Sequence, residues 1–88
     1  MLATTLNIVA TPASQAVPLQ PTNIVVVQNP SEQNVYVLLG SSGVTVTPGT
    51  NGTNVPPGTA LHLTISTNTD LAVATAVGNA QVELSFAA

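Results

Sequence analysis

The 88-residue chain contains no lysine, no arginine and no cysteine. Nucleic-acid binding needs cationic side chains to replace condensed counterions, and attachment to anionic lipid needs a polybasic segment. Without cysteine the chain forms neither disulfides nor thiolate metal sites. The composition therefore excludes nucleic-acid binding, charge-driven membrane attachment and a disulfide framework.

Long hydrophobic runs are also missing. The longest uninterrupted apolar runs span about five residues, far fewer than the ~20 that a membrane helix needs. The N-terminus lacks the cationic region and apolar stretch of a signal peptide. We therefore expect no membrane partner and synthesis in the cytoplasm.

What the chain does have is apolar and uncharged polar residues. Hydrophobic residues make up 44% of it, which argues against disorder, and charged residues only 3%. At this length we expect one domain over residues 1–88, with residues 1–14 forming either an N-terminal arm or a first strand. A domain this small has a thin stability margin, so a docking partner or an oligomer is expected.

Proline and glycine recur at short intervals between runs rich in valine, isoleucine, leucine and threonine, which is the pattern of an all-β fold. The sequence predicts a compact antiparallel β-sandwich of seven or eight short strands. The expected strands cover residues 4–10, 15–19, 23–28, 34–39, 44–47, 59–66, 71–77 and 80–86.

Three of these segments carry more detailed expectations. Pro18 cannot donate to a ladder, so residues 15–19 are expected at a sheet edge. Residues 23–28 and 34–39 are expected to pair as a β-hairpin with a loop of about five residues. Residues 71–77 are rich in alanine and have helical propensity, but turn residues on both sides favour a strand.

Alternation of apolar and polar residues predicts which side chains are buried. The expected set is Ile24, Val26, Val35, Val37, Val44, Val46, Leu61, Leu63, Ile65, Val82, Leu84 and Phe86. Natural edge strands are commonly protected by lysine, and this chain has none. We therefore expect the edges near residues 44–47 and 80–86 to be bare in the free subunit and covered by partner chains.

Candidate chemistry is sparse. His62 is the only histidine, and alternation already explains it as the exposed face of a strand. Glu32, Asp70 and Glu83 are the only acids, and Ser41-Ser42 lies in a G-S-S-G loop that is not the G-x-S-x-G elbow of hydrolases. Asn51-Gly52-Thr53 fits a glycosylation sequon but also simply favours a turn.

We therefore expect no catalytic, cofactor-binding or metal-binding residues, no cofactor, and no small-molecule substrate. Tyr36 is the better interface candidate of the two aromatic residues, because in V-Y-V it faces away from its valine neighbours. The expected bare strands add three further interface candidates, which are Val44, Val46 and Phe86.

A sequence of short motifs also carries a resemblance. Residues 17–40 read V-P-L-Q-P-T-N-I-V-V-V-Q-N-P-S-E-Q-N-V-Y-V-L-L-G, followed by G-V-T-V, P-P-G-T-A-L-H-L and T-D-L-A-V. This order resembles small β-sandwich domains of tailed-bacteriophage virions, of the head decoration, cement or head-fibre base type, over residues 15–86. Such domains often have a cation before the strand that here begins after Thr22-Asn23, and this chain has none there.

The resemblance implies a virion structural protein. The expected function is capsid decoration or cementing on the outer surface of the head, at subunit junctions, with the major capsid protein or copies of itself as partners. An outer position agrees with a net charge of −3, because packaged DNA would repel it. The alternative is a head- or tail-fibre module for host attachment, and a small hydrolase ranks third.

Overall fold

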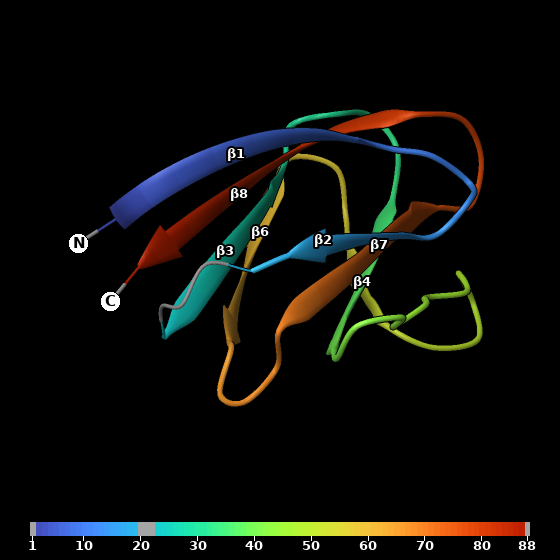
Figure 1. Cartoon of the computed structure of the whole chain (residues 1–88). Helices are drawn as coiled ribbons and strands as arrows, with labels where there is room; N and C mark the ends of the chain where they lie inside the picture. The colour runs from blue at the N-terminus through green and yellow to red at the C-terminus, as the bar shows by residue number, and fades with distance from the viewer. Residues whose placement is uncertain (1, 20–22, 88) are drawn as a thin grey trace.

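The computed structural model describes residues 2–19 and 23–87, which form two four-stranded sheets facing each other (Figure 1). The eight strands are β1 (Leu2–Ala10), β2 (Gln15–Pro18), β3 (Ile24–Asn29), β4 (Val35–Gly40), β5 (Thr53–Val55), β6 (Thr59–Thr64), β7 (Asp70–Thr75) and β8 (Ala80–Ala87). No helix in these residues is long and apolar enough to cross a membrane. The predicted all-β antiparallel sandwich is confirmed.

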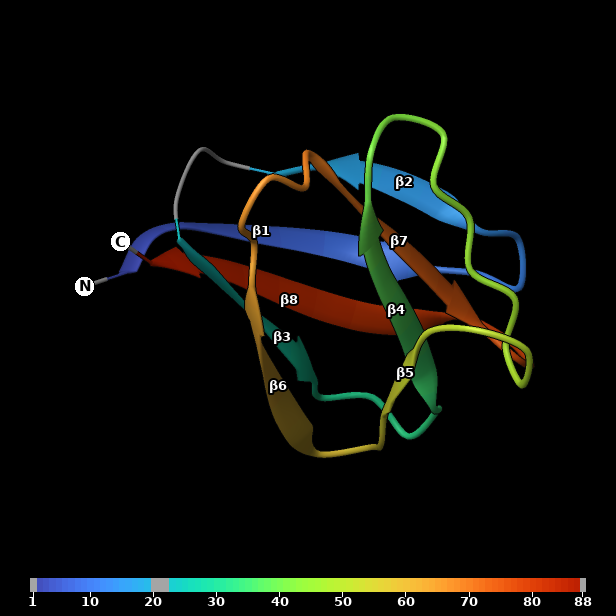
Figure 2. The ribbon, with the colours of Figure 1, turned by 90° about the horizontal axis from the view of Figure 1, so that it is seen from below.

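The two sheets have different strand orders. Sheet A runs β1-β8-β3-β6 and sheet B runs β2-β7-β4-β5, and every neighbouring pair is antiparallel. Every connection between consecutive strands except that from β4 to β5 joins one sheet to the other (Figure 2). Eight strands wound through two sheets in this order form a jelly roll.

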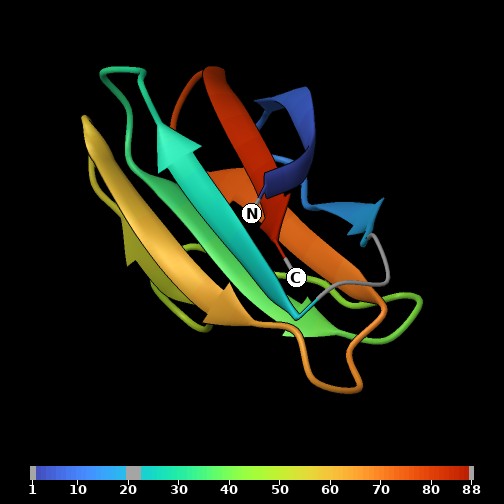
Figure 3. The same cartoon turned by 90° about the vertical axis from the view of Figure 1, so that its left-hand side faces the viewer.

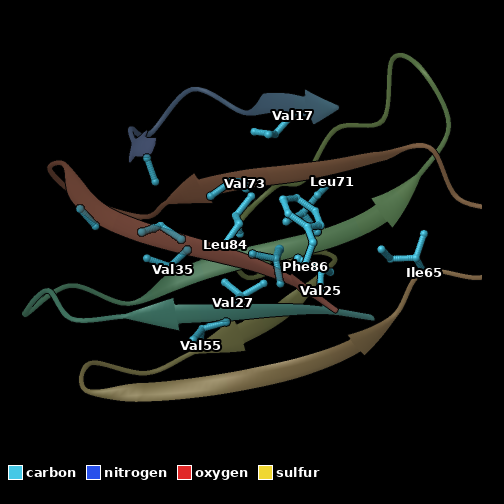
Figure 4. Packing of buried hydrophobic residues seen from close by; sticks show 14 residues of the cluster. Val17, Val25, Val27, Val35, Val55, Ile65, Leu71, Val73, Leu84 and Phe86 are labelled. Carbon is cyan, nitrogen blue, oxygen red and sulfur yellow. The ribbon is translucent and has the colours of Figure 1, made fainter. Parts of the chain in front are cut away.

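The main core lies between the two sheets. Sheet A contributes Val25, Val27, Leu84 and Phe86, which meet side chains of sheet B such as Val73 (Figure 4). The buried residues of this main core, taken from both sheets, are Ala10, Val17, Val25, Val27, Val35, Val37, Val55, Ile65, Leu71, Val73, Ala80, Val82, Leu84 and Phe86. Most are β-branched or aliphatic residues of moderate size, which suit a pleated, two-layer interior.

A second, smaller apolar cluster lies on the outer face of sheet B. The loop between β4 and β5 crosses this face and buries Val46 against Ala72 and Ala74 of β7. The backbone N–H of Val46 donates to the Ser14 Oγ, and that of Thr47 donates to the Asn51 Oδ1. Because the side chains of β7 here are small, the loop lies close to the strand, which is consequently buried on both faces.

One expectation about pairing is wrong. Residues 23–28 and 34–39 do contain strands, but β3 lies in sheet A and β4 in sheet B, so they form no hairpin. The connection after β3 crosses to the other sheet, as all but one do, and the buried Asn29 holds it: its Nδ2 donates to the carbonyl oxygens of Gln33 and Val55. Its Oδ1 accepts from the N–H and hydroxyl of Ser31. These bonds stabilise a crossing between the sheets rather than a tight turn.

Other local expectations are also corrected. Residues 44–47 form no strand, because Val46 packs under the loop instead of joining a ladder. In β3 the alternation runs the other way, since Val25 and Val27 are buried while Ile24 and Val26 are only half-buried. The strand over residues 80–86 is not an edge, because β8 pairs with β1 on one side and β3 on the other.

The core predicts unequal costs for two leucine substitutions. Leu84 is fully buried in central strand β8, whereas Leu63 is half-buried in β6. Leu84→Ala should lower the free energy of unfolding by about 3 kcal/mol, and Leu63→Ala by less than about 2 kcal/mol, because less contact is lost. Urea unfolding followed by circular dichroism measures both, and equal losses would contradict the assigned burial.

The outer cluster predicts a difference between two glycines of the loop. Both have positive φ, but a Cβ on Gly52 would collide with Val46 and lie 2.9 Å from the Val37 carbonyl oxygen, while Gly49 has open space. Gly49→Ala should cost about 1 kcal/mol of unfolding free energy from backbone strain alone. Gly52→Ala should cost about 1–3 kcal/mol more, since overpacking adds to strain. Similar urea midpoints for the two variants would show that the loop does not pack as described.

Candidate functional site

The side chains capable of acid–base chemistry are spread over the fold. His62 is exposed in β6, Glu83 is half-exposed in β8, and Glu32 lies in the turn after β3. Asp70 begins β7 and accepts a hydrogen bond from the Thr69 hydroxyl at 2.8 Å. Among residues 2–19 and 23–87, no three His, Cys, Asp or Glu side chains gather as a metal site.

Two shallow hollows open on the surface, and neither is lined by a charged side chain. The larger, about 330 Å³, lies between the end of β3 and the start of β6 and is lined by Gln28, Asn29, Pro30, Gly58, Thr59 and Ala60. The other, about 260 Å³, lies beside Tyr36 under the β4–β5 loop. In the larger hollow the Asn29 amide and the Thr59 hydroxyl already bond protein partners, and its lining includes no histidine or acid beside that hydroxyl.

The four interface candidates occupy different places. Tyr36 and Val44 are half-buried and pack against the outer cluster of sheet B. Val46 and Phe86 are buried, in the outer cluster and in the main core respectively. The structure brings Tyr36, Val44 and Val46 together and leaves Phe86 apart. Their role as interface residues stays a prediction.

The sheet edges are the most open part of the backbone. Sheet A ends at β1 and β6, and sheet B ends at β2 and β5. Figure 3 shows β6, coloured yellow, at one side of the molecule and β1, in blue, toward the other. An edge strand exposes unpaired N–H and C=O groups, which can pair with another chain unless something blocks them.

The two edges of sheet B are blocked by proline or by shortness. β2 has four residues and includes Pro18, which has no N–H to donate. This confirms the edge strand expected for residues 15–19. β5 has three residues and is followed directly by Pro56 and Pro57. Neither strand offers a long row of donors and acceptors.

The β6 edge of sheet A is open. The N–H of Ile65 donates to the Asn23 carbonyl at 2.8 Å, so residues 65 and 23 form a hydrogen-bonded pair. Antiparallel ladders alternate bonded and non-bonded pairs, so the backbones of Leu63 and Leu61 bond to β3. The N–H and C=O groups of Ala60, His62 and Thr64 therefore point away from the sheet.

The same alternation can be followed across sheet A to β1. Val26 is not bonded to β6, so its backbone bonds to Ser85 of β8 on the other side. The alternate residues of β8, Leu84 and Val82, then bond to Leu6 and Ile8 of β1. The backbones of Thr5, Asn7 and Val9 then point outward. The Gln15 Nε2 donates to the Val9 carbonyl at 2.9 Å, which agrees with that direction.

Both open edges are uncharged in sequence. β1 reads LATTLNIVA and β6 reads TALHLT, with neither proline nor lysine in either strand. Leu6 and Val9 are also among the exposed large hydrophobic residues. The absence of lysine from the sequence predicts unprotected sheet edges. Which strands lie at those edges depends on how the chain crosses between the sheets, and no local sequence pattern shows that.

The chain is similar to a known protein in its fold and not in its sequence. No protein-family model matches the chain, and no curated protein matches it either. A solved chain from Bacillus endospore appendages, which are described as a family of disulfide-linked pili, superposes with a TM-score of 0.50 at 12% sequence identity. The match covers 96% of this chain and 83% of that one.

The expected relation to tailed-phage virion proteins is therefore wrong. The motifs behind it are turn chemistry and strand pattern, which many sandwiches share. A solved structure that shares this fold comes from an endospore appendage, so the expected capsid-decoration function and the location on a phage head are corrected. Nothing in this match supports a major capsid protein as partner. What it does show is the shared fold.

Proposed function

We propose that this chain is a structural subunit of a surface fibre or appendage, assembled from copies of itself and without enzymatic activity. The observation that carries the proposal is the pair of open, uncharged edges on sheet A. The fold shared with a subunit of endospore appendages supports it. The alternative of a fibre module lies closer to this proposal than capsid decoration does, although nothing in the structure favours host attachment.

Open sheet edges carry a risk of unwanted pairing with other chains, and soluble proteins block them. Soluble sheets commonly protect their edges with lysine, proline or short strands, and sheet B uses proline and short strands. Sheet A has a nine-residue strand at one edge and a six-residue strand at the other, with neither device. Because the edges of sheet B are protected and those of sheet A are not, we expect copies of the chain to pair through the edges of sheet A.

The joints between copies must be non-covalent. The similar appendages are described as disulfide-linked, but this chain has no cysteine. Its copies therefore associate through backbone hydrogen bonds, apolar contacts and uncharged side chains. This difference separates the proposed assembly from the chemistry of the solved appendages, although the fold is shared.

Purified protein should form filaments that electron microscopy detects at high protein concentration. Because no disulfide holds them, filaments should survive a reducing agent such as dithiothreitol and dissociate in urea. A chain that stays monomeric in analytical ultracentrifugation at every concentration tested would argue against the proposed function.

A lysine on the open edge should prevent assembly. Thr64→Lys places a charged side chain on β6, where the backbone points outward, and it should raise the concentration needed for filaments by about tenfold or more. Gln81→Lys is the matched control, because Gln81 is exposed but lies in the central strand β8. Equal effects of both lysines would show that net charge, and not the edge, controls assembly.

Assembly should depend only weakly on salt. The chain has three acids and one histidine, so few charges are available for screening. Between roughly 50 and 500 mM sodium chloride the critical concentration should change by less than about threefold, whereas charge-driven association falls steeply over that range. Light scattering across a salt series measures it, and a steep loss of filaments with salt would refute the non-ionic joint.

A further inference from the structure

The two open edges of sheet A fit each other. We propose that β6 of one copy pairs with β1 of the next, antiparallel, with His62 opposite Asn7. This inference rests on the proposed function and adds the surface, the partner strand and the register. The direction of the strands, the positions of the outward backbone groups and the faces on which the side chains lie all support this pairing.

Strand direction makes the pairing compatible with a continuing fibre. β1 is antiparallel to β8, β8 to β3, and β3 to β6, so β1 and β6 of one copy run in opposite directions. A second copy in the same orientation therefore brings its β1 antiparallel to β6. Because the two edges differ, the contact is heterologous and each added copy presents a fresh β6 edge.

The outward backbone groups match in number and spacing. The outward backbone groups of β6 belong to Ala60, His62 and Thr64, and those of β1 belong to residues 5, 7 and 9. In both strands they occur at every second residue. Antiparallel pairing places Ala60 opposite Val9, His62 opposite Asn7, and Thr64 opposite residue 5. The pairs of His62 with Asn7 and of Thr64 with residue 5 can each exchange two backbone hydrogen bonds, as in any antiparallel ladder. At the third pair the Val9 carbonyl already accepts from the Gln15 Nε2, so the joint there shares or displaces that bond.

The side chains of both sets lie on the same face of sheet A. Leu61 and Leu63 pack against the core, so His62 and Thr64 face outward. Ile8 and Ala10 pack against the core, so Asn7 and Val9 face outward as well. The proposed register therefore places His62, Thr64 and Asn7, together with the apolar Ala60 and Val9, on the outer face, and it continues the apolar inner face of the sheet.

The register also favours this joint over a two-fold contact of β6 with itself. A symmetric β6–β6 contact would place the His62 side chains of the two copies opposite each other. Such an isologous contact would also stop at a dimer and could not extend into a fibre. Opposite Asn7, the imidazole of His62 meets an amide that can both donate and accept hydrogen bonds. Val9, which is 46% exposed in the single subunit, would lie beside the small side chain of Ala60.

Cysteine cross-linking tests the joint, because the chain has no cysteine of its own. Directly opposite residues in a bonded antiparallel pair have Cα atoms about 5.5 Å apart, within the range of a disulfide. Under a mild oxidant, filaments of the double variant Asn7→Cys/His62→Cys should give a ladder of covalent multimers on a non-reducing gel. The single variants should stay monomeric on the same gel.

The controls separate the possible failures. Gln81→Cys/His62→Cys keeps two exposed cysteines but should give no ladder, because β8 is central. Covalent dimers from His62→Cys alone would overturn the heterologous joint in favour of a symmetric one. A ladder only from Val9→Cys/His62→Cys would overturn the register. Filaments without any ladder would overturn the edge pairing while leaving the proposed function intact, and the absence of filaments from the native chain would contradict both.

Discussion

Unpaired backbone groups at the sheet edges are the constraint on which this molecule depends. Every buried strand of the sandwich bonds on both sides, whereas an edge strand leaves alternate N–H and C=O groups facing water. Sheet B limits these groups with Pro18 and with the short strand β5. Sheet A leaves them exposed along β1 and β6, and the low charge of the chain adds no protection.

The main core and the sheet crossings fix the positions of the two open strands. The main core fixes β8 and β3 between the two open strands, and the bonds of Asn29 direct the chain across to sheet B. The β4–β5 loop covers the outer face of sheet B, so that β7 is buried on both sides. Sheet B therefore has short or proline-containing edges and a loop across part of its outer face, whereas both edge strands of sheet A are longer and uncharged.

The sequence predicted the strands better than their arrangement. Turn residues and alternation located most strands, and Pro18 marked an edge, because these signals are local. The hairpin expected for residues 23–39 is wrong because the connection after β3 crosses to the other sheet. Contacts distant in sequence hold that crossing, such as the hydrogen bond from Asn29 to Val55, and no local pattern contains them. Ile24 and Val26 were assigned to the wrong face because their strand is apolar on both faces, so alternation carries no information there. The absence of lysine predicted unprotected edges, but it placed them at residues 44–47 and 80–86. Only the tertiary structure shows that β1 and β6 are the open edge strands.

Amide hydrogen exchange, resolved by residue, tests the central claim most directly. It compares the native chain at low concentration with its assembled form. If sheet A joins the copies, the amides of His62, Thr64 and Asn7 exchange freely in the single subunit and become protected on assembly, while that of Ala16 in β2 changes little. Equal exchange at His62 and Asn7 in both states, or new protection confined to β2 and β5, would contradict the claim that sheet A joins the copies.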